Sequence, residues 1–130
     1  DDYGIFNVDY VQISDSSFEN VQGALANIYR GGTDESTFGP HFSLTNSELK
    51  NVGGGSKNKS KSSIYLHGVQ VTSIENNRFS NSPAIKIEHT VGEPVTRFVK
   101  NSLTETPLPT VSELHSKLEN TALIKDNLVK

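Results

Sequence analysis

Five residues carry the side chains best suited to chemistry on a ligand: Tyr29, Arg30, Tyr65, His67 and Lys86. Aromatic rings stack on the apolar faces of sugar rings, while His, Lys and Arg bind carboxylates. On successive turns of a repeated fold, four of them would form an outward column suited to an acidic glycan: Tyr29, Tyr65, His67 and Lys86. Outward aromatic residues also occur simply to cover a sheet or to meet another domain, and that alternative stays open.

The tightest cluster of functional groups lies between Arg30 and Glu35. Arg30 could hold a carboxylate through its fork of donors, with Asp34 and Glu35 binding sugar hydroxyls or calcium. Alternatively, Arg30 pairs with one of these acids to fix a loop whose Gly31-Gly32 turn needs unusual dihedral angles. Calcium takes six to eight oxygen ligands, so two adjacent acids are weak evidence for a metal site. We therefore assign no metal or cofactor to this chain.

Other cationic residues have simpler interpretations. Lys57, Lys59 and Lys61 lie in a Gly- and Ser-rich segment that could attract a polyanion, although a solvated loop is the better explanation. His41 and His89 are expected to be structural, with ring nitrogens that cap strand ends. The histidines show no zinc-ligand spacing.

The elements that must position these residues follow from a pattern that occurs five times. An apolar residue is followed three places later by a polar one, and two places after that by a second apolar residue. The second apolar residues lie 31, 30, 24 and 26 residues apart, within the period of a solenoid. The five sets are Ile13, Ser16, Phe18; Leu44, Ser47, Leu49; Ile74, Asn77, Phe79; Phe98, Asn101, Leu103; and Ile124, Asn127, Val129. We expect the polar members to stack at a tight bend and to bond the backbone of the neighbouring coil.

Strands are predicted over residues 5–13, 24–29, 63–67, 69–74 and 84–88, where β-branched and aromatic residues alternate with polar ones. Short strands at this variable period, with Asn, Ser and Gly at the bends, favour an all-β parallel β-helix of about five coils. An antiparallel sandwich is the structural alternative. The residues expected to point inward are Ile28, Ile64, Leu66, Ile85 and Ile87, and those expected outward are Tyr29, Tyr65, His67, Lys86 and Glu88.

One short helix is predicted near residues 110–118. Thr110 and Glu113 have the spacing of a capping box, and Val111, Leu114 and Leu118 share one helical face. This helix would be inserted between two coils or would plug one end of the stack.

Composition sets the outer bounds. The chain has 130 residues, a third of them hydrophobic, and a net charge of -3, which gives no reason to expect nucleic acid or a membrane as partner. It has no cysteine and no apolar run near the roughly 20 residues that span a bilayer. We expect one domain over residues 1–130, or a piece of something longer.

Three stretches carry a resemblance to a known family: Tyr29–Pro40 (YRGGTDESTFGP), His67–Thr72 (HGVQVT) and His89–Thr96 (HTVGEPVT). Together they resemble polysaccharide lyase family 6, which contains alginate lyases and the chondroitinase B type of lyase. The alginate-lyase branch is the more similar. The resemblance covers most of residues 5–104 and implies a right-handed parallel β-helix.

The resemblance implies β-elimination next to a uronate carboxylate, with a Lys as base, an Arg assisting and, in many members, a calcium ion that neutralises the carboxylate. No matching set is found in this sequence, so no catalytic residue is carried over. The implied assignment is the C-terminal coils of a longer, secreted or periplasmic bacterial lyase. If this segment had activity of its own, Tyr65, His67 and Lys86 would supply the base and Arg30 the neutraliser.

Three hypotheses follow for the role of the chain. It is a non-catalytic segment that packs on the preceding coils of a lyase, a module that binds alginate or a related uronate glycan, or an oligomerisation element that forms a homodimer. The last rests on the unpaired strand edges at the ends of a β-helix.

Overall fold

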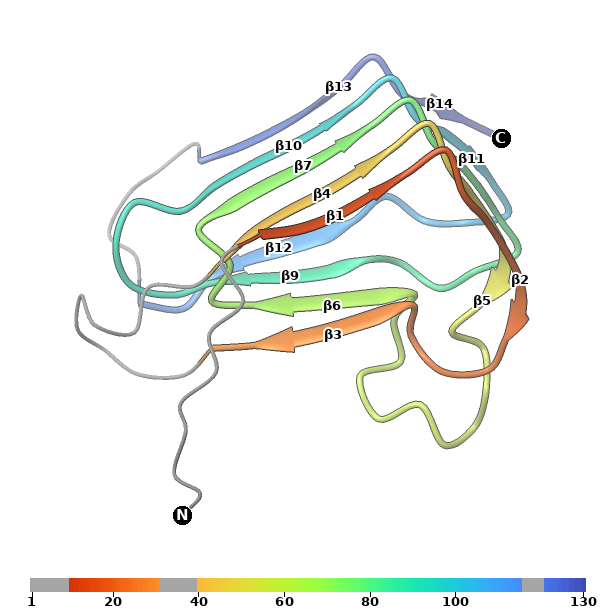
Figure 1. Ribbon diagram of the computed structural model, residues 1–130, viewed down its shortest axis with the longest axis horizontal. Helices are drawn as coiled ribbons and strands as arrows, with labels where there is room; N and C mark the ends of the chain where they lie inside the picture. Colours follow the sequence, from red (N-terminus) through yellow and green to blue (C-terminus); the bar gives the residue numbers. More distant parts are fainter. Residues whose placement is uncertain (1–9, 31–39, 116–120) are drawn as a thin grey trace.

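A computed structural model of the chain describes residues 10–30, 40–115 and 121–130. These residues wind into a right-handed parallel β-helix, so the fold predicted from the sequence is confirmed (Figure 1). Every strand pair is parallel, which excludes the antiparallel sandwich. Among the described residues there is no helix long and apolar enough to span a membrane.

Three sheets form the walls of the β-helix. The first contains β1 (Tyr10–Ser14), β4 (His41–Thr45), β7 (Val71–Glu75), β10 (Val95–Val99) and β13 (Ala122–Lys125). The second contains β2 (Ser17–Val21), β5 (Glu48–Val52), β8 (Arg78–Ser80), β11 (Ser102–Thr104) and β14 (Leu128–Val129). The third contains β3 (Ala26–Tyr29), β6 (Ile64–His67), β9 (Lys86–His89) and β12 (Thr110–Glu113).

One strand from each sheet makes one coil. The described residues complete four coils, and β13 and β14 begin another, so the expected five coils overstate the number of full turns. Figure 1 shows the strands of each sheet stacked in chain order, one above the next. Residues that repeat along the sequence therefore lie directly above one another.

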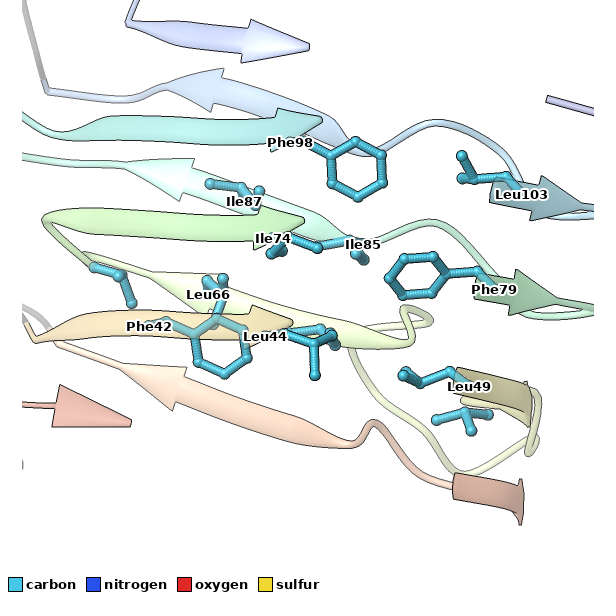
Figure 2. Close-up of a cluster of buried hydrophobic side chains, with 13 residues drawn as sticks. Phe42, Leu44, Leu49, Leu66, Ile74, Phe79, Ile85, Ile87, Phe98 and Leu103 are labelled. Atoms are coloured by element: carbon cyan, nitrogen blue, oxygen red, sulfur yellow. The ribbon is translucent and has the colours of Figure 1, made fainter. Parts of the chain in front are cut away.

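The core is a set of inward-facing columns, and strand register explains it. Leu44 pairs with Ile74 and Ile74 with Phe98, while Leu49 pairs with Phe79 and Phe79 with Leu103. All are at most 1% exposed (Figure 2). The inward positions predicted in the third sheet are also correct, since Ile64, Leu66, Ile85 and Ile87 are buried and Ile28 packs against them.

The polar member of each repeat forms a ladder at the bend between the first and second sheets, as predicted. We call Ser16, Ser47, Asn77, Asn101 and Asn127 the corner ladder. The backbone N–H of Asn77 donates to Oδ1 of Asn101 at 2.9 Å, and that of Asn101 donates to Oδ1 of Asn127 at 2.9 Å. Each amide group in turn donates to a carbonyl of the coil before it, as Asn101 Nδ2 does to Ile74 at 3.0 Å.

The helix predicted near residues 110–118 is wrong where the structure describes it. Residues 110–113 form β12, which pairs in parallel with β9 and places Val111 beside Ile87. Leu114 and His115 form a bend, and residues 116–118 lie outside the described residues. The capping box does not form because Glu113 points inward to His89 (Nδ1 to Oε1, 2.7 Å) while the Thr110 N–H donates to Ile85 O. Pairing with the neighbouring coil therefore overrides a local helix signal.

Candidate functional site

The outward residues of the third sheet form two adjacent columns rather than the single column expected. In one, Asn27 pairs with Tyr65 and Tyr65 with Lys86. In the other, Tyr29 pairs with His67 and His67 with Glu88. Strict alternation along β3, β6 and β9 produces this arrangement, because residues two apart point to the same face. Four of the five predicted site residues thus lie on one surface.

Glu88 is the hub of this surface. The Tyr65 hydroxyl donates to Glu88 Oε1 at 2.5 Å, and His67 Nδ1 lies 2.8 Å from the same oxygen. Lys86 Nζ lies 3.9 Å from Glu88 Oε2. The side chain of Glu88 is only 16% exposed, so these contacts are partly shielded from solvent.

The network shifts the pKa values of two of its members. Burial, together with the hydrogen bond to Glu88 and its negative charge, raises the pKa of Tyr65 from 10.0 to about 12. Burial alone would raise the pKa of Glu88. The hydrogen bonds from Tyr65 and His67 and the charges of Lys86 and His67 outweigh burial, so that the pKa of Glu88 lies below its ordinary value. At neutral pH the hub is therefore a carboxylate, and Tyr65 keeps its proton.

Aromatic stacking organises the edge of the surface nearest the first coil. The rings of Tyr29 and His67 stack with centroids 4.3 Å apart and planes 8° from parallel. Tyr29 is 68% exposed, so one face of this stack remains available to a ligand. Lys86 Nζ lies 5.7 Å from the centroid of the Tyr65 ring, within the range of a cation–π interaction.

A groove of about 660 Å³ opens beside these columns. One wall is the third sheet and the other is the loop that joins β5 to β6, drawn yellow-green in Figure 1. The lining residues are Gly23, Ala24, Asn27, Tyr29, Lys57, Asn58, Lys59, Ser60, Tyr65 and Lys86. This lining combines two aromatic rings with three ammonium groups.

The remaining predicted residues lie elsewhere. Arg30 follows β3, is half-buried and is not among the residues that line the groove; its backbone N–H donates to His67 O at 2.8 Å. Asp34 and Glu35 lie outside the described residues, so their predicted roles remain predictions. His41 is exposed at the start of β4 and meets the ring of Tyr10 edge-on.

His89 is structural, as expected, although it is buried inside the coils rather than placed at their surface. Its ring is fully buried, with Nε2 2.7 Å from Thr96 Oγ1 and Nδ1 2.7 Å from Glu113 Oε1. Thr121 Oγ1 lies 2.9 Å from the same Nδ1 and also donates to Glu113. His89 therefore connects three successive coils.

Sequence reasoning did not include Glu88 in the site, and it named Lys57 and Lys59 only as part of a loop that could attract a polyanion. Glu88 was expected to point outward, and its position two residues after Lys86 was the signal that placed it on the same face. Lys57 and Lys59 gave no such signal, because only the folded loop brings them opposite the third sheet.

Among residues 10–30, 40–115 and 121–130, no group of three or more His, Asp or Glu side chains is arranged to hold a metal ion.

The groups that line the groove are of types that can hold a ligand. The Tyr65 hydroxyl holds its proton in the bond to Glu88, and Glu88 orients the His67 ring through Nδ1, so neither of these two atoms is free to accept a proton. The predicted neutraliser, Arg30, does not line the groove. Two rings and three cations instead provide stacking surfaces and partners for anions.

The fold places the chain among the right-handed parallel β-helix proteins, and solved structures give the family. Over its whole length the chain is similar to PL6 family alginate lyase AlyGC, with a TM-score of 0.90 and 47% sequence identity. A mutant of that enzyme gives a TM-score of 0.88 and 45% identity. The resemblance to polysaccharide lyase family 6 is thereby confirmed: the whole chain is similar in fold and sequence to a portion of the PL6 family alginate lyase AlyGC.

The match covers only part of AlyGC, since the chain spans 18% of the length of each AlyGC chain. No protein-family model and no curated protein matches the sequence.

Proposed function

We propose that this chain is a non-catalytic segment of a polysaccharide lyase that resembles family 6 alginate lyases, and that its coils support the coils that carry the catalytic residues. The observation that supports this proposal is the full-length similarity to 18% of an alginate lyase. The segment is the C-terminal part of the longer, secreted or periplasmic enzyme, and any calcium ion is held outside the residues described here.

Incomplete burial of inward-facing residues in the first coil supports this role as a segment that packs on other coils. The inward-facing apolar residues of the middle coils that form the core are at most 3% exposed, but Val11, Ile13, Phe18 and Ile28 of the first coil are only half-buried. Each of them heads a column whose other members are covered by a neighbouring coil. Another coil with a matching apolar face would bury them, as in any stacked repeat. A second copy of this chain is the alternative partner.

Absorbance of the unsaturated uronate product tests whether the segment is catalytic. The chain is incubated with alginate and with dermatan sulfate, and we expect no rise in ultraviolet absorbance. A rise that disappears in the double variant Lys86→Ala, His67→Ala would overturn the proposal, because the segment would then carry its own base. The control is Lys50→Ala, His41→Ala, which removes the same residue types from exposed positions outside the groove.

A second function is favoured by the groove. We propose that the third sheet also contacts uronate polysaccharide, with Tyr29, Tyr65 and Lys86 as binding residues. This role does not require chemistry, and it is compatible with a supporting segment that lies along the path of a long polymer. A Tyr65→Ala, Lys86→Ala variant should lose affinity for alginate oligosaccharides, and unchanged affinity would exclude this second function.

A further inference from the structure

The loop between β5 and β6, residues 53–63, is an ordered structure with its own internal brace. Asn58 is buried within it, and its side-chain amide donates to the carbonyls of Gly53 and Ser62 at 2.8 Å each. The loop is also bonded to the first coil, where the Gly55 N–H donates to Gln22 O at 2.9 Å. The loop is thereby fixed next to the corner that joins β2 to β3 (Figure 1).

This brace determines where the loop lysines point. Lys57 and Lys59 flank Asn58, and both are exposed while Asn58 is buried. Both line the groove, opposite the strands that carry Tyr65 and Lys86. Lys61, two residues further on, does not line it. The loop therefore directs two of its three lysines toward the third sheet.

The charge of the groove is unbalanced. Its lining holds Lys57, Lys59 and Lys86 and no carboxylate. Lys86 is already 3.9 Å from Glu88, whereas among the described residues neither loop lysine forms an ion pair. A ligand that carries closely spaced carboxylates would supply the missing partners, and the attraction would be strongest where the walls exclude solvent.

We propose that residues 53–63 form a clamp that selects acidic over neutral oligosaccharides, with Lys57 and Lys59 binding carboxylates of a sugar chain whose rings lie against Tyr29 and Tyr65. This inference rests on the second proposed function, glycan contact by the third sheet. It adds specificity determinants from a different part of the chain. The tyrosines would bind many sugars, because stacking does not depend on charge. The lysines would provide the selectivity for acidic over neutral oligosaccharides.

Calorimetric titration of the chain with oligomannuronate, oligoguluronate and neutral cello-oligosaccharides of equal length tests this clamp. We expect Lys57→Gln, Lys59→Gln to weaken binding of the acidic oligosaccharides by about tenfold or more, since two charge-assisted contacts are lost. Binding of the neutral oligosaccharide should be weak and unchanged. The matched control Lys50→Gln, Lys125→Gln removes the same charge from exposed residues of β5 and β13 and should stay within about twofold at physiological salt.

Two further variants separate position from charge. Lys57→Arg, Lys59→Arg should retain most of the affinity, because both cations remain. Asn58→Ala retains both lysines but removes the brace, and it should weaken acidic binding if the loop must be held in place.

The outcomes distinguish this inference from the functions on which it depends. If the wild-type chain binds acidic oligosaccharides and the Lys57→Gln, Lys59→Gln variant binds them equally well, the clamp is wrong while glycan contact by the third sheet stands. If the wild-type chain binds no acidic oligosaccharide, both are wrong, and the supporting role in the lyase is unaffected.

Discussion

At each bend of the corner ladder, two consecutive residues have separate roles: the first turns the chain, and the second bonds the neighbouring coil. The residue before each ladder position has a positive φ, between 50° and 59°, which lets the chain turn sharply from the first sheet to the second. Asn and Asp tolerate this conformation better than other non-glycine residues, and they occupy four of these five positions. The ladder side chain then supplies the hydrogen bonds that the backbone loses at the turn. These positions are Asp15, Asn46, Asn76, Lys100 and Asp126.

Removing one rung should destabilise the whole stack. Asn101 is 2% exposed, and its Oδ1 accepts both from the Asn77 N–H at 2.9 Å and from Asn77 Nδ2 at 3.0 Å. Asn101→Ala leaves the buried Asn77 N–H without its partner, whereas Asn77 Nδ2 keeps its bond to Leu44 O at 2.9 Å. We therefore expect a loss of about 3 kcal/mol in the free energy of unfolding. Urea denaturation measures it. Asn27→Ala, at an exposed position in β3, is the control and should change stability by less than about 0.5 kcal/mol; equal losses would contradict the ladder's role.

The Tyr65–Glu88 bond predicts a defined pH dependence. Because the pKa of Tyr65 is raised to about 12 in the folded chain, its contribution to stability is complete below the unfolded value of 10.0. It is lost as the pH rises from 10.0 through about 12, since the unfolded chain releases this proton first. The free energy of unfolding should therefore fall over this interval, and the fall should be smaller in Tyr65→Phe.

Glu88→Gln isolates the cause of that shift. It removes the negative charge that opposes ionisation, so phenolate absorbance should show Tyr65 titrating at a lower pH than in the wild-type chain. A Tyr65 titration unchanged by Glu88→Gln would show that burial alone sets its pKa.

At the scale of elements, neighbouring strands of the third sheet approach so closely at one point that no side chain larger than that of glycine fits. Gly68 follows β6 with φ +84°, and a Cβ there would lie 2.3 Å from Arg30 O. It ends the strand that carries Tyr65 and His67, so the site depends on it for its register. By contrast, a Cβ on Gly23 would meet nothing within 4 Å.

Gly68→Ala and Gly23→Ala form a matched pair that measures this contact. We expect Gly68→Ala to lower the free energy of unfolding by about 3 kcal/mol, because both the conformation and the space are unfavourable. Gly23→Ala should change it by less than about 1 kcal/mol, and the loss of unfolded-state entropy favours a small gain. Similar urea midpoints for the two variants would contradict the close approach of β3 and β6.

The elements also show why the sequence predicts some features and not others. Columns such as Leu44, Ile74 and Phe98 were predictable because each residue repeats at the solenoid period and alternates within its strand. The helix predicted near residues 110–118 is wrong over residues 110–113, because a capping box is a local signal whereas β12 is held by pairing with β9 of the previous coil. The groove was beyond prediction for the same reason, since only the path of an irregular loop brings Lys57 into the same groove as Lys86.

For the molecule as a whole, burial depends on position in the stack. Each coil is covered by its neighbours on both sides, except at the two ends of the described coils. Phe79, in the middle, is 1% exposed and contacts Phe98 with ring centroids 6.0 Å apart. Phe18 occupies the equivalent place in the first coil, paired with Leu49, and is only half-buried.

The same substitution should therefore have different effects at these two places. Phe79→Ala opens a cavity between covered coils and should lower the free energy of unfolding by about 3–5 kcal/mol. Phe18→Ala should lower it by only about 1–2 kcal/mol in this chain, because less apolar surface is buried there. In a longer polypeptide that adds a coil before β1, the loss from Phe18→Ala should approach that of Phe79→Ala, since stacking would cover Phe18 as it covers Phe79. Urea denaturation of both variants in both polypeptides measures this difference, and a Phe18→Ala loss that stays small in the longer polypeptide would show that the preceding coils do not stack on this face.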